Sequence, residues 1–236
     1  MTLLMKEEYR RLRNYEETVF NCFERHCIIS AQDREALKIA GRQKIEIITN
    51  GVDFSIFYPM QTAKQYDVLF SGNMGYGPNI DAAFYAATQV FPLILSKIPA
   101  AKMLIAGVNP SAKIRRLANA NIEVREKFSH IRDAFAASRV NLVPVITSIG
   151  LQNKILQSMA MKIPTVTTPA GARGTDAEGK DVLLTGTTPK ELAAHVLDLL
   201  HDKTLYETIA EKAYVYVLKN YSWENANQKL LELILH

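Results

Sequence analysis

Short apolar runs rich in β-branched residues alternate with longer segments of helical spacing along most of the chain. Such runs are typical of parallel strands that are buried on both faces. The predicted strands are residues 26–30, 45–49, 67–71, 103–107, 140–145, 164–168 and 182–184. The predicted helices are residues 3–23, 79–96, 110–118, 131–137, 151–161 and 189–200, with a short one after Ser30. This alternation favours βαβ units and an α/β fold, with a doubly wound parallel sheet over residues 67–184 and helices on both faces.

The two ends of the chain differ from this pattern. No strand follows residue 200, and residues 203–220 and 223–235 read as two closing helices. The first predicted helix carries an apolar stripe made of Tyr9, Leu12, Tyr15, Val19, Phe20 and Phe23. Ser30 and Asp33 form a variant of the capping box at the start of the next helix. A polar stretch over residues 59–65 reads as a linker, so we expect a domain boundary near residues 57–66.

Composition narrows the class of protein. The 236 residues carry a net charge of +4, which is too small and too scattered an excess to suggest a nucleic-acid partner. No apolar run approaches the roughly 18 residues of a spanning helix, and no secretory signal opens the chain. Cys22 and Cys27 have no second cysteine pair, so we expect two reduced thiols and no zinc site. We therefore expect a cytoplasmic protein, with peripheral contact at the inner face of a membrane as a further option.

Two loops after predicted strands carry candidate chemistry, because ligands of open parallel sheets bind outside the carboxyl ends of the strands. One loop holds Gly72, Gly75 and Gly77 before a helix start, which suits a phosphate, although a tight turn explains these glycines equally well. The other holds Gly150 before a helix with Lys154 in its first turn. A diphosphate would explain a lysine placed against the helix dipole, and a solvated lysine is the alternative. We expect Lys154 and Gly150 to border the largest polar cleft of this domain, near the loop from Gly72 to Gly75.

Other motifs point away from metal and nucleophilic chemistry. Residues 174–180 have the glycine spacing of a P-loop, but Asp181 stands where a magnesium-binding hydroxyl is needed, and a strand follows. The histidines lack metal-ligand spacing, and no nucleophile elbow occurs. We therefore expect neither a metal nor a cofactor.

An ordered series of short motifs resembles glycosyltransferase family 4, the retaining glycosyltransferases of the GT-B fold. Any one of these motifs is weak, but their order and spacing match over residues 10–230. They are NGVD at 50–53, FYP at 57–59, VLFSG at 68–72, PN at 78–79, MLIAG at 103–107 with Pro110, GLQNK at 150–154, MAM at 159–161, PTV at 164–166 and YSW at 221–223. The sugar transferases of bacterial exopolysaccharide synthesis are the most similar branch.

The resemblance implies a Rossmann-like sheet that forms the C-terminal, donor-binding half of a GT-B enzyme. Residues 59–222 are then the nucleotide-sugar donor domain, residues 1–58 the tail of an acceptor domain plus linker, and residues 223–236 a closing helix. The implied reaction moves a hexosyl group from a nucleotide-diphosphate sugar to a glycan or lipid-linked acceptor. Carried over by position, the donor-binding residues are Gly72, Asn73, Phe128, Gly150, Leu151, Gln152, Asn153, Lys154 and Gln157. Among them, Phe128 or its neighbours would line the pocket for the base.

Two positions depart from the family pattern. Many relatives carry a sugar-binding glutamate where Ile149 stands and a ribose-binding glutamate where Gln157 stands. An amide lacks the charge-assisted hydrogen bond of a carboxylate, so we expect donor binding weaker by about 1–2 kcal/mol.

Little of an acceptor domain precedes the linker, so the two N-terminal strands would be left with unpaired edges. We expect that this chain alone does not transfer sugar to an external acceptor. The apolar stripe of its first helix would then seek a separate N-terminal acceptor domain or a second copy. The alternative is a catalytically degenerate nucleotide-sugar-binding partner or a fragment of a longer protein. An epimerase of the same architecture is a third option that no residue favours.

Overall fold

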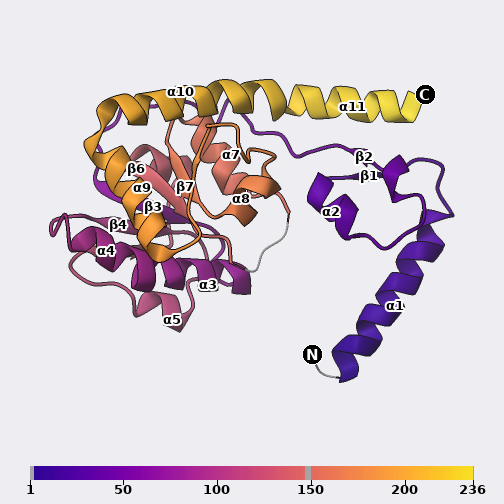
Figure 1. Cartoon of the computed structure of the whole chain (residues 1–236), viewed down its shortest axis with the longest axis horizontal. Coiled ribbons are helices and arrows are strands. Elements are labelled where there is room, and N and C mark those ends of the chain that lie inside the picture. Colours follow the sequence, from indigo (N-terminus) through magenta and orange to yellow (C-terminus); the bar gives the residue numbers. More distant parts are fainter. Residues whose placement is uncertain (1–2, 147–149, 236) are drawn as a thin grey trace.

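The computed structural model describes residues 3–146 and 150–235 (Figure 1). Its main sheet has six parallel strands in the order β5-β4-β3-β6-β7-β8. They are β3 (Tyr66–Ser71), β4 (Met103–Ala106), β5 (Ile122–Arg125), β6 (Ser138–Val143), β7 (Thr165–Thr167) and β8 (Leu184–Thr185). The predicted α/β fold with a doubly wound parallel sheet is thereby confirmed. The chain runs from β3 to one edge and then from β6 to the other, so the switch point lies between β3 and β6.

Helices cover both faces of this sheet. The helices on one face are α3 (Gly77–Tyr85), α4 (Phe91–Leu95), α5 (Ala112–Arg115) and α9 (Pro189–His201). Those on the other are α6 (Arg132–Ala136), α7 (Asn153–Ala160) and α8 (Pro169–Gly174). Along β3, Val68 and Phe70 enter the first core and Leu69 enters the second, and all three are fully buried. This two-sided burial explains why β3 is a continuous apolar run.

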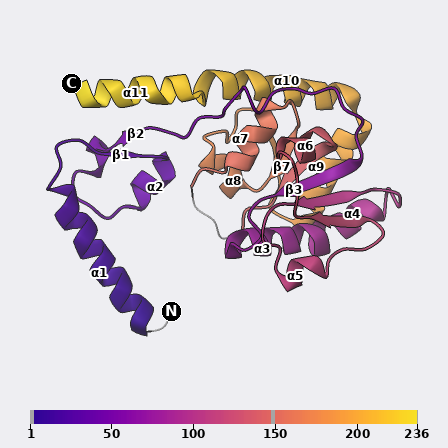
Figure 2. The same ribbon diagram turned by 180° about the vertical axis from the view of Figure 1, so that it is seen from behind.

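Residues 3–50 form a small separate unit. It contains α1 (Leu3–Phe20), β1 (Cys27–Ile28), α2 (Ala31–Ala36), the 3₁₀ turn η1 (Arg42–Lys44) and β2 (Glu46–Ile47). β1 and β2 pair in parallel as a two-stranded sheet of their own. Helix α1 stands apart from the main sheet unit in both views (Figure 2). Its Tyr9, Leu12 and Tyr15 side chains are exposed. It ends three residues earlier than predicted, and Phe20 stacks on His26 with ring centroids 3.9 Å apart.

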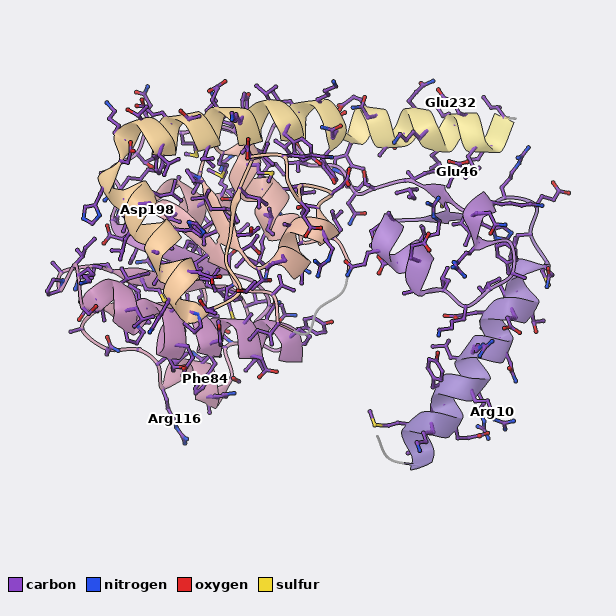
Figure 3. All side chains as sticks on the ribbon, in the orientation of Figure 1. Arg10, Glu46, Phe84, Arg116, Asp198 and Glu232 are labelled. Carbon is purple, nitrogen blue, oxygen red and sulfur yellow. The ribbon has the colours of Figure 1, made fainter. Side chains whose placement is uncertain are left out.

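The closing helices are α10 (Lys203–Asn220) and α11 (Trp223–Leu235), and both match the sequence prediction. α10 packs on the main sheet unit, and α11 continues over β2 (Figure 1). Glu46 of β2 and Glu232 of α11 line one groove between the N-terminal unit and α11 (Figure 3). Val52 donates a 2.7 Å backbone hydrogen bond to the carbonyl of Tyr221, which ties the segment after β2 to the end of α10. Among the described residues, no helix is both long and apolar enough to cross a bilayer.

Strand β5 was not predicted from the sequence. Ile122 and Val124 face the core, whereas Glu123 is exposed and Arg125 half-buried, so the strand alternates instead of forming a continuous apolar run. Such alternation is expected at the edge of a sheet, where one face is wet. A search for uninterrupted apolar runs therefore overlooked it.

The predicted helix over residues 79–96 is divided in the structure. α3 leads into a π-helical turn over Ala86–Val90, and α4 follows. Pro92 cannot donate a backbone hydrogen bond and crowds the carbonyl of the preceding turn, which explains a local change of helix type there. Helix α8 was also missed, because its two glycines hid a helix that begins with Pro169 at a favoured position.

Candidate functional site

The loop after β3 and the first turn of α7 meet at the switch point of the main sheet. The Lys154 ammonium nitrogen lies 2.6 Å from Asn79 Oδ1. A Cβ atom placed on Gly72 would lie 3.0 Å from the same nitrogen. The structure therefore brings together the two loops that the sequence singled out, at the place where open α/β sheets bind ligands.

Lys154 is held from the core side. The buried side chain of Asn141 on β6 donates a 3.2 Å hydrogen bond to the Lys154 carbonyl, which fixes the first turn of α7. The ammonium also lies 4.7 Å from the centre of the Phe70 ring. Burial lowers the pKa of Lys154 to about 8. Within the described residues Lys154 has no salt bridge, so its charge is available for an anion.

The Gly72 loop is ordered by its own polar groups. Asn73 Oδ1 accepts a 3.0 Å hydrogen bond from the Gly75 N–H, and the Asn79 amide donates to the Asn73 carbonyl at 3.1 Å. Met74 is fully buried, and its N–H bonds to the Val108 carbonyl at 2.8 Å. These hydrogen bonds define the shape of the loop, and Asn73 is exposed on it.

The first turn of α7 comes shortly after a glycine in a left-handed backbone conformation. Gly150 has φ +95° and is buried, while Leu151 and Gln157 are half-buried and Asn153 is exposed. Gln152 precedes α7, and its side-chain amide donates to the Gly150 carbonyl at 3.4 Å. Helix N-termini leave N–H groups without helical partners, so this turn can offer donors to an anion. The roles assigned to these residues stay predictions.

Ile149 lies outside the described residues. The polar cleft expected beside Gly150 borders the same undescribed positions, 147–149, and stays a prediction.

Phe128 lies on the opposite side of the switch point, just after β5. Its ring is half-buried against the core, and the Arg125 guanidinium lies 5.4 Å from its centre. Arg125 also donates to the Tyr66 hydroxyl at 2.9 Å and to Glu123 at 2.7 Å. Phe128 thus lies on a fixed polar and aromatic surface, and its contact with a nucleoside base stays a prediction.

Sequence reasoning missed three contributors to the site. Asn79 stands out in the sequence only as part of the PN motif, whereas Asn141 is recognisable as a polar residue inside an apolar strand. Gln32 gave no signal, because it is 118 residues from Gly150, whose N–H it meets at 3.5 Å. Among the described residues, no three His, Cys, Asp or Glu side chains gather as a metal site.

Comparison with known proteins gives a family match and a distant relative. A family model described as glycosyl transferases group 1 matches residues 65–202. An uncharacterized 44.6 kDa protein in the cps region of Klebsiella pneumoniae is 21% identical over 164 residues, which are 66% of this chain and 42% of that protein.

Solved structures show the same fold. Anabaena HepE, in complex with UDP-glucose, aligns with a TM-score of 0.74 and 17% identity over 94% of this chain and 66% of its own. The C-terminal domain of LpcC, a group 1 glycosyl transferase family protein from Francisella tularensis, aligns with a TM-score of 0.58 and 19% identity over 73% of this chain and all of that domain. The main sheet therefore has the fold of a GT-B C-terminal domain. The chain spans less than half of the Klebsiella protein and about two thirds of HepE.

Proposed function

Because the chain belongs to the group 1 glycosyl transferases, we propose that it binds a nucleotide-diphosphate sugar through residues 59–222. In this proposal it serves as the donor half of a hexosyltransferase that acts on a glycan or lipid-linked acceptor. The UDP-glucose complex of HepE supports the donor class, and the cps-region relative supports a role in polysaccharide synthesis.

The observation that carries the proposal is the ammonium of Lys154 beside the Gly72 loop. Departure of a nucleoside diphosphate develops negative charge on the leaving phosphate. A fixed cation and the N–H groups at the start of α7 would stabilise that charge without a metal. Lys154 lies 2.6 Å from the neutral amide oxygen of Asn79, which orients the ammonium without cancelling its charge.

Ligand binding tests this proposal directly. UDP-, GDP- and ADP-sugars are titrated into the full chain by calorimetry, and thermal unfolding is followed with each. A ligand at about 100 times its Kd should add about 2.7 kcal/mol to the free energy of unfolding. If none of the three classes binds or stabilises the chain, the proposal is wrong.

We expect donor binding without transfer from the 236-residue chain on its own. Transfer requires donor and acceptor to be held in register, which supplies several kcal/mol of the barrier reduction. The N-terminal unit offers two strands of two residues each and an exposed helix α1, which is little surface on which to hold an acceptor. Size-exclusion chromatography and a transfer assay, with and without an added acceptor domain, check this expectation. Robust transfer by the monomeric chain would contradict it.

A degenerate nucleotide-sugar-binding partner is the second candidate function, and Gln157 is the residue that favours it. Gln157 is half-buried one turn beyond the start of α7, and its neutral amide stands at the position of a ribose-binding carboxylate in the resembling family. Measurable hydrolysis or transfer with an acceptor domain present would exclude this candidate.

Gln157→Glu is expected to tighten donor binding by about 1–2 kcal/mol, because a carboxylate accepts stronger hydrogen bonds from ribose hydroxyls. The measurement is calorimetry with the sugar nucleotide that the wild type binds. Gln228→Glu on the exposed part of α11 makes the same charge change and should leave affinity unaltered. Equal affinity of Gln157→Glu and wild type would remove Gln157 from the binding site.

A further inference from the structure

The first turn of α2 lies against Gly150, in the loop that precedes α7. Gln32 Oε1 is 3.5 Å from the Gly150 N–H nitrogen. A Cβ atom built on Gly150 would lie 3.1 and 3.3 Å from the two carboxylate oxygens of Asp33, so both oxygens face this glycine. Both views place α2 on the side of the N-terminal unit that faces α8 (Figures 1 and 2). A carboxylate from the N-terminal unit thus meets the loop that precedes Lys154.

The Asp33 carboxylate is held in place but not neutralised. The buried Ser30 hydroxyl donates to Oδ2 at 2.6 Å, and the Asp33 N–H donates back to Ser30 Oγ at 3.0 Å. The nearby arginines pair with other acids, Arg34 with Glu35 and Arg173 with Glu178. Asp33 forms no salt bridge within the described parts of the chain, and its side chain is only half-buried. It can therefore accept hydrogen bonds from a ligand.

The proposed binding residues set the direction of a bound donor. In the proposed function Lys154 binds the diphosphate at the switch point between β3 and β6, and Phe128, on the β5 side of it, contacts the base. With the nucleoside toward β5, the sugar at the other end of the diphosphate extends toward the β6 side, where Gly150 and α2 lie.

We propose that the Asp33 carboxylate accepts hydrogen bonds from hydroxyl groups of the donor sugar and so determines which sugars bind. This inference rests on the proposed function, because it requires a nucleotide-diphosphate sugar at Lys154. Hydrogen bonds from neutral hydroxyls to a carboxylate are charge-assisted and strong. A sugar that carries its own carboxylate would be repelled at this position. The substrate class is therefore a neutral hexose with free hydroxyls and not a uronic acid.

Asp33→Asn keeps the shape of the side chain and removes its charge. The full-length wild type and variant are titrated with UDP, UDP-glucose and UDP-glucuronate, or with the matching GDP or ADP compounds if the wild type prefers another base. We expect the variant to bind the neutral sugar nucleotide about tenfold more weakly. Its affinity for the nucleoside diphosphate should be unchanged, and its affinity for the uronic acid conjugate should rise.

The nucleoside diphosphate also reports whether the variant is folded. Glu35→Gln on the same helix removes the same charge from an exposed position and should alter none of the three affinities. An equal loss for the nucleoside diphosphate and its sugar conjugate would assign Asp33 a structural role and overturn the inference. Tighter binding of all three ligands would mean that Asp33 only repels the diphosphate, which also overturns it. If the wild type binds no nucleotide at all, the proposed function itself has failed.

Discussion

Lys154→Met is expected to weaken binding of the nucleotide-diphosphate sugar by about 2–3 kcal/mol, because it removes a largely desolvated cation from beside an anion. Methionine preserves most of the side-chain volume against Phe70, so the fold should remain intact. Lys162→Met, just after the same helix, is the matched control, since Lys162 pairs with Glu211 on α10. Calorimetry with the three proteins gives the comparison. Unchanged affinity in Lys154→Met would contradict the diphosphate role.

The same lysine predicts the pH dependence of binding. In the free chain burial lowers the pKa of Lys154 to about 8, so the side chain is mostly charged at pH 7 and mostly neutral at pH 9. A bound diphosphate favours the charged form and raises this pKa. Binding therefore takes up a proton, and affinity falls above pH 8 by up to about tenfold per pH unit. Lys154→Arg keeps its charge throughout this range, and its affinity should stay level.

The free chain shows the opposite trend in stability. The pKa of Lys154 lies below its ordinary value of 10.5, so the unfolded state binds more protons between pH 8 and 10.5. The contribution of Lys154 to the free energy of unfolding therefore rises with pH across this window. If unfolding caused the drop in donor affinity at high pH, donor affinity and the free energy of unfolding would fall together. If deprotonation of Lys154 causes it, donor affinity falls while the contribution of Lys154 to the free energy of unfolding rises.

The main sheet was predictable because its central strands are buried on both faces. The side chains of Val68, Leu69 and Phe70 pack into two cores, one on each face of the sheet. These successive positions are therefore all apolar, and the strand is recognisable as a continuous apolar run. The edge strand β5 was not predicted, because Glu123 and Arg125 face away from the core and interrupt the apolar run. The boundaries of α3 and α4 were not predictable either, because a π-helical turn depends on local packing around Pro92 and not on hydrophobic periodicity.

Only the part of the candidate site that follows from the sheet topology was predictable from the sequence. The rule that ligands bind at the carboxyl ends of strands was enough to put Gly72 and Lys154 in neighbouring loops. The amide of Asn79, which orients the ammonium, and the carboxylate of Asp33 reach the site through tertiary contacts. Gln32 on α2 and Gly150 are 118 residues apart, so no motif spacing or periodicity in the sequence indicates their contact.

Gly107, which lies beside the Gly72 loop, allows the ends of β3 and β4 to approach each other closely. Gly107 follows β4 with φ +148°, and a Cβ atom there would lie 1.7 Å from the carbonyl oxygen of Gly72. The ends of β3 and β4 can approach this closely only without a side chain, and Gly72 N–H bonds to the Ala106 carbonyl at 3.0 Å across the same gap. Any residue with a Cβ must therefore push the two loops apart.

Gly107→Ala is expected to lower the free energy of unfolding by about 3 kcal/mol, since the added methyl group meets backbone that cannot rotate away. Urea denaturation measures the loss, and Gly77→Ala is the matched control. Gly77 begins α3, and nothing lies within 4 Å of its built Cβ atom. Alanine at residue 77 should change stability by less than about 0.5 kcal/mol. If Gly107→Ala unfolded at the same urea concentration as the wild type, the close approach of the two strand ends would not exist in solution. Because the Gly72 loop also contacts Lys154, a Gly107→Ala chain that remains folded should bind the donor more weakly as well.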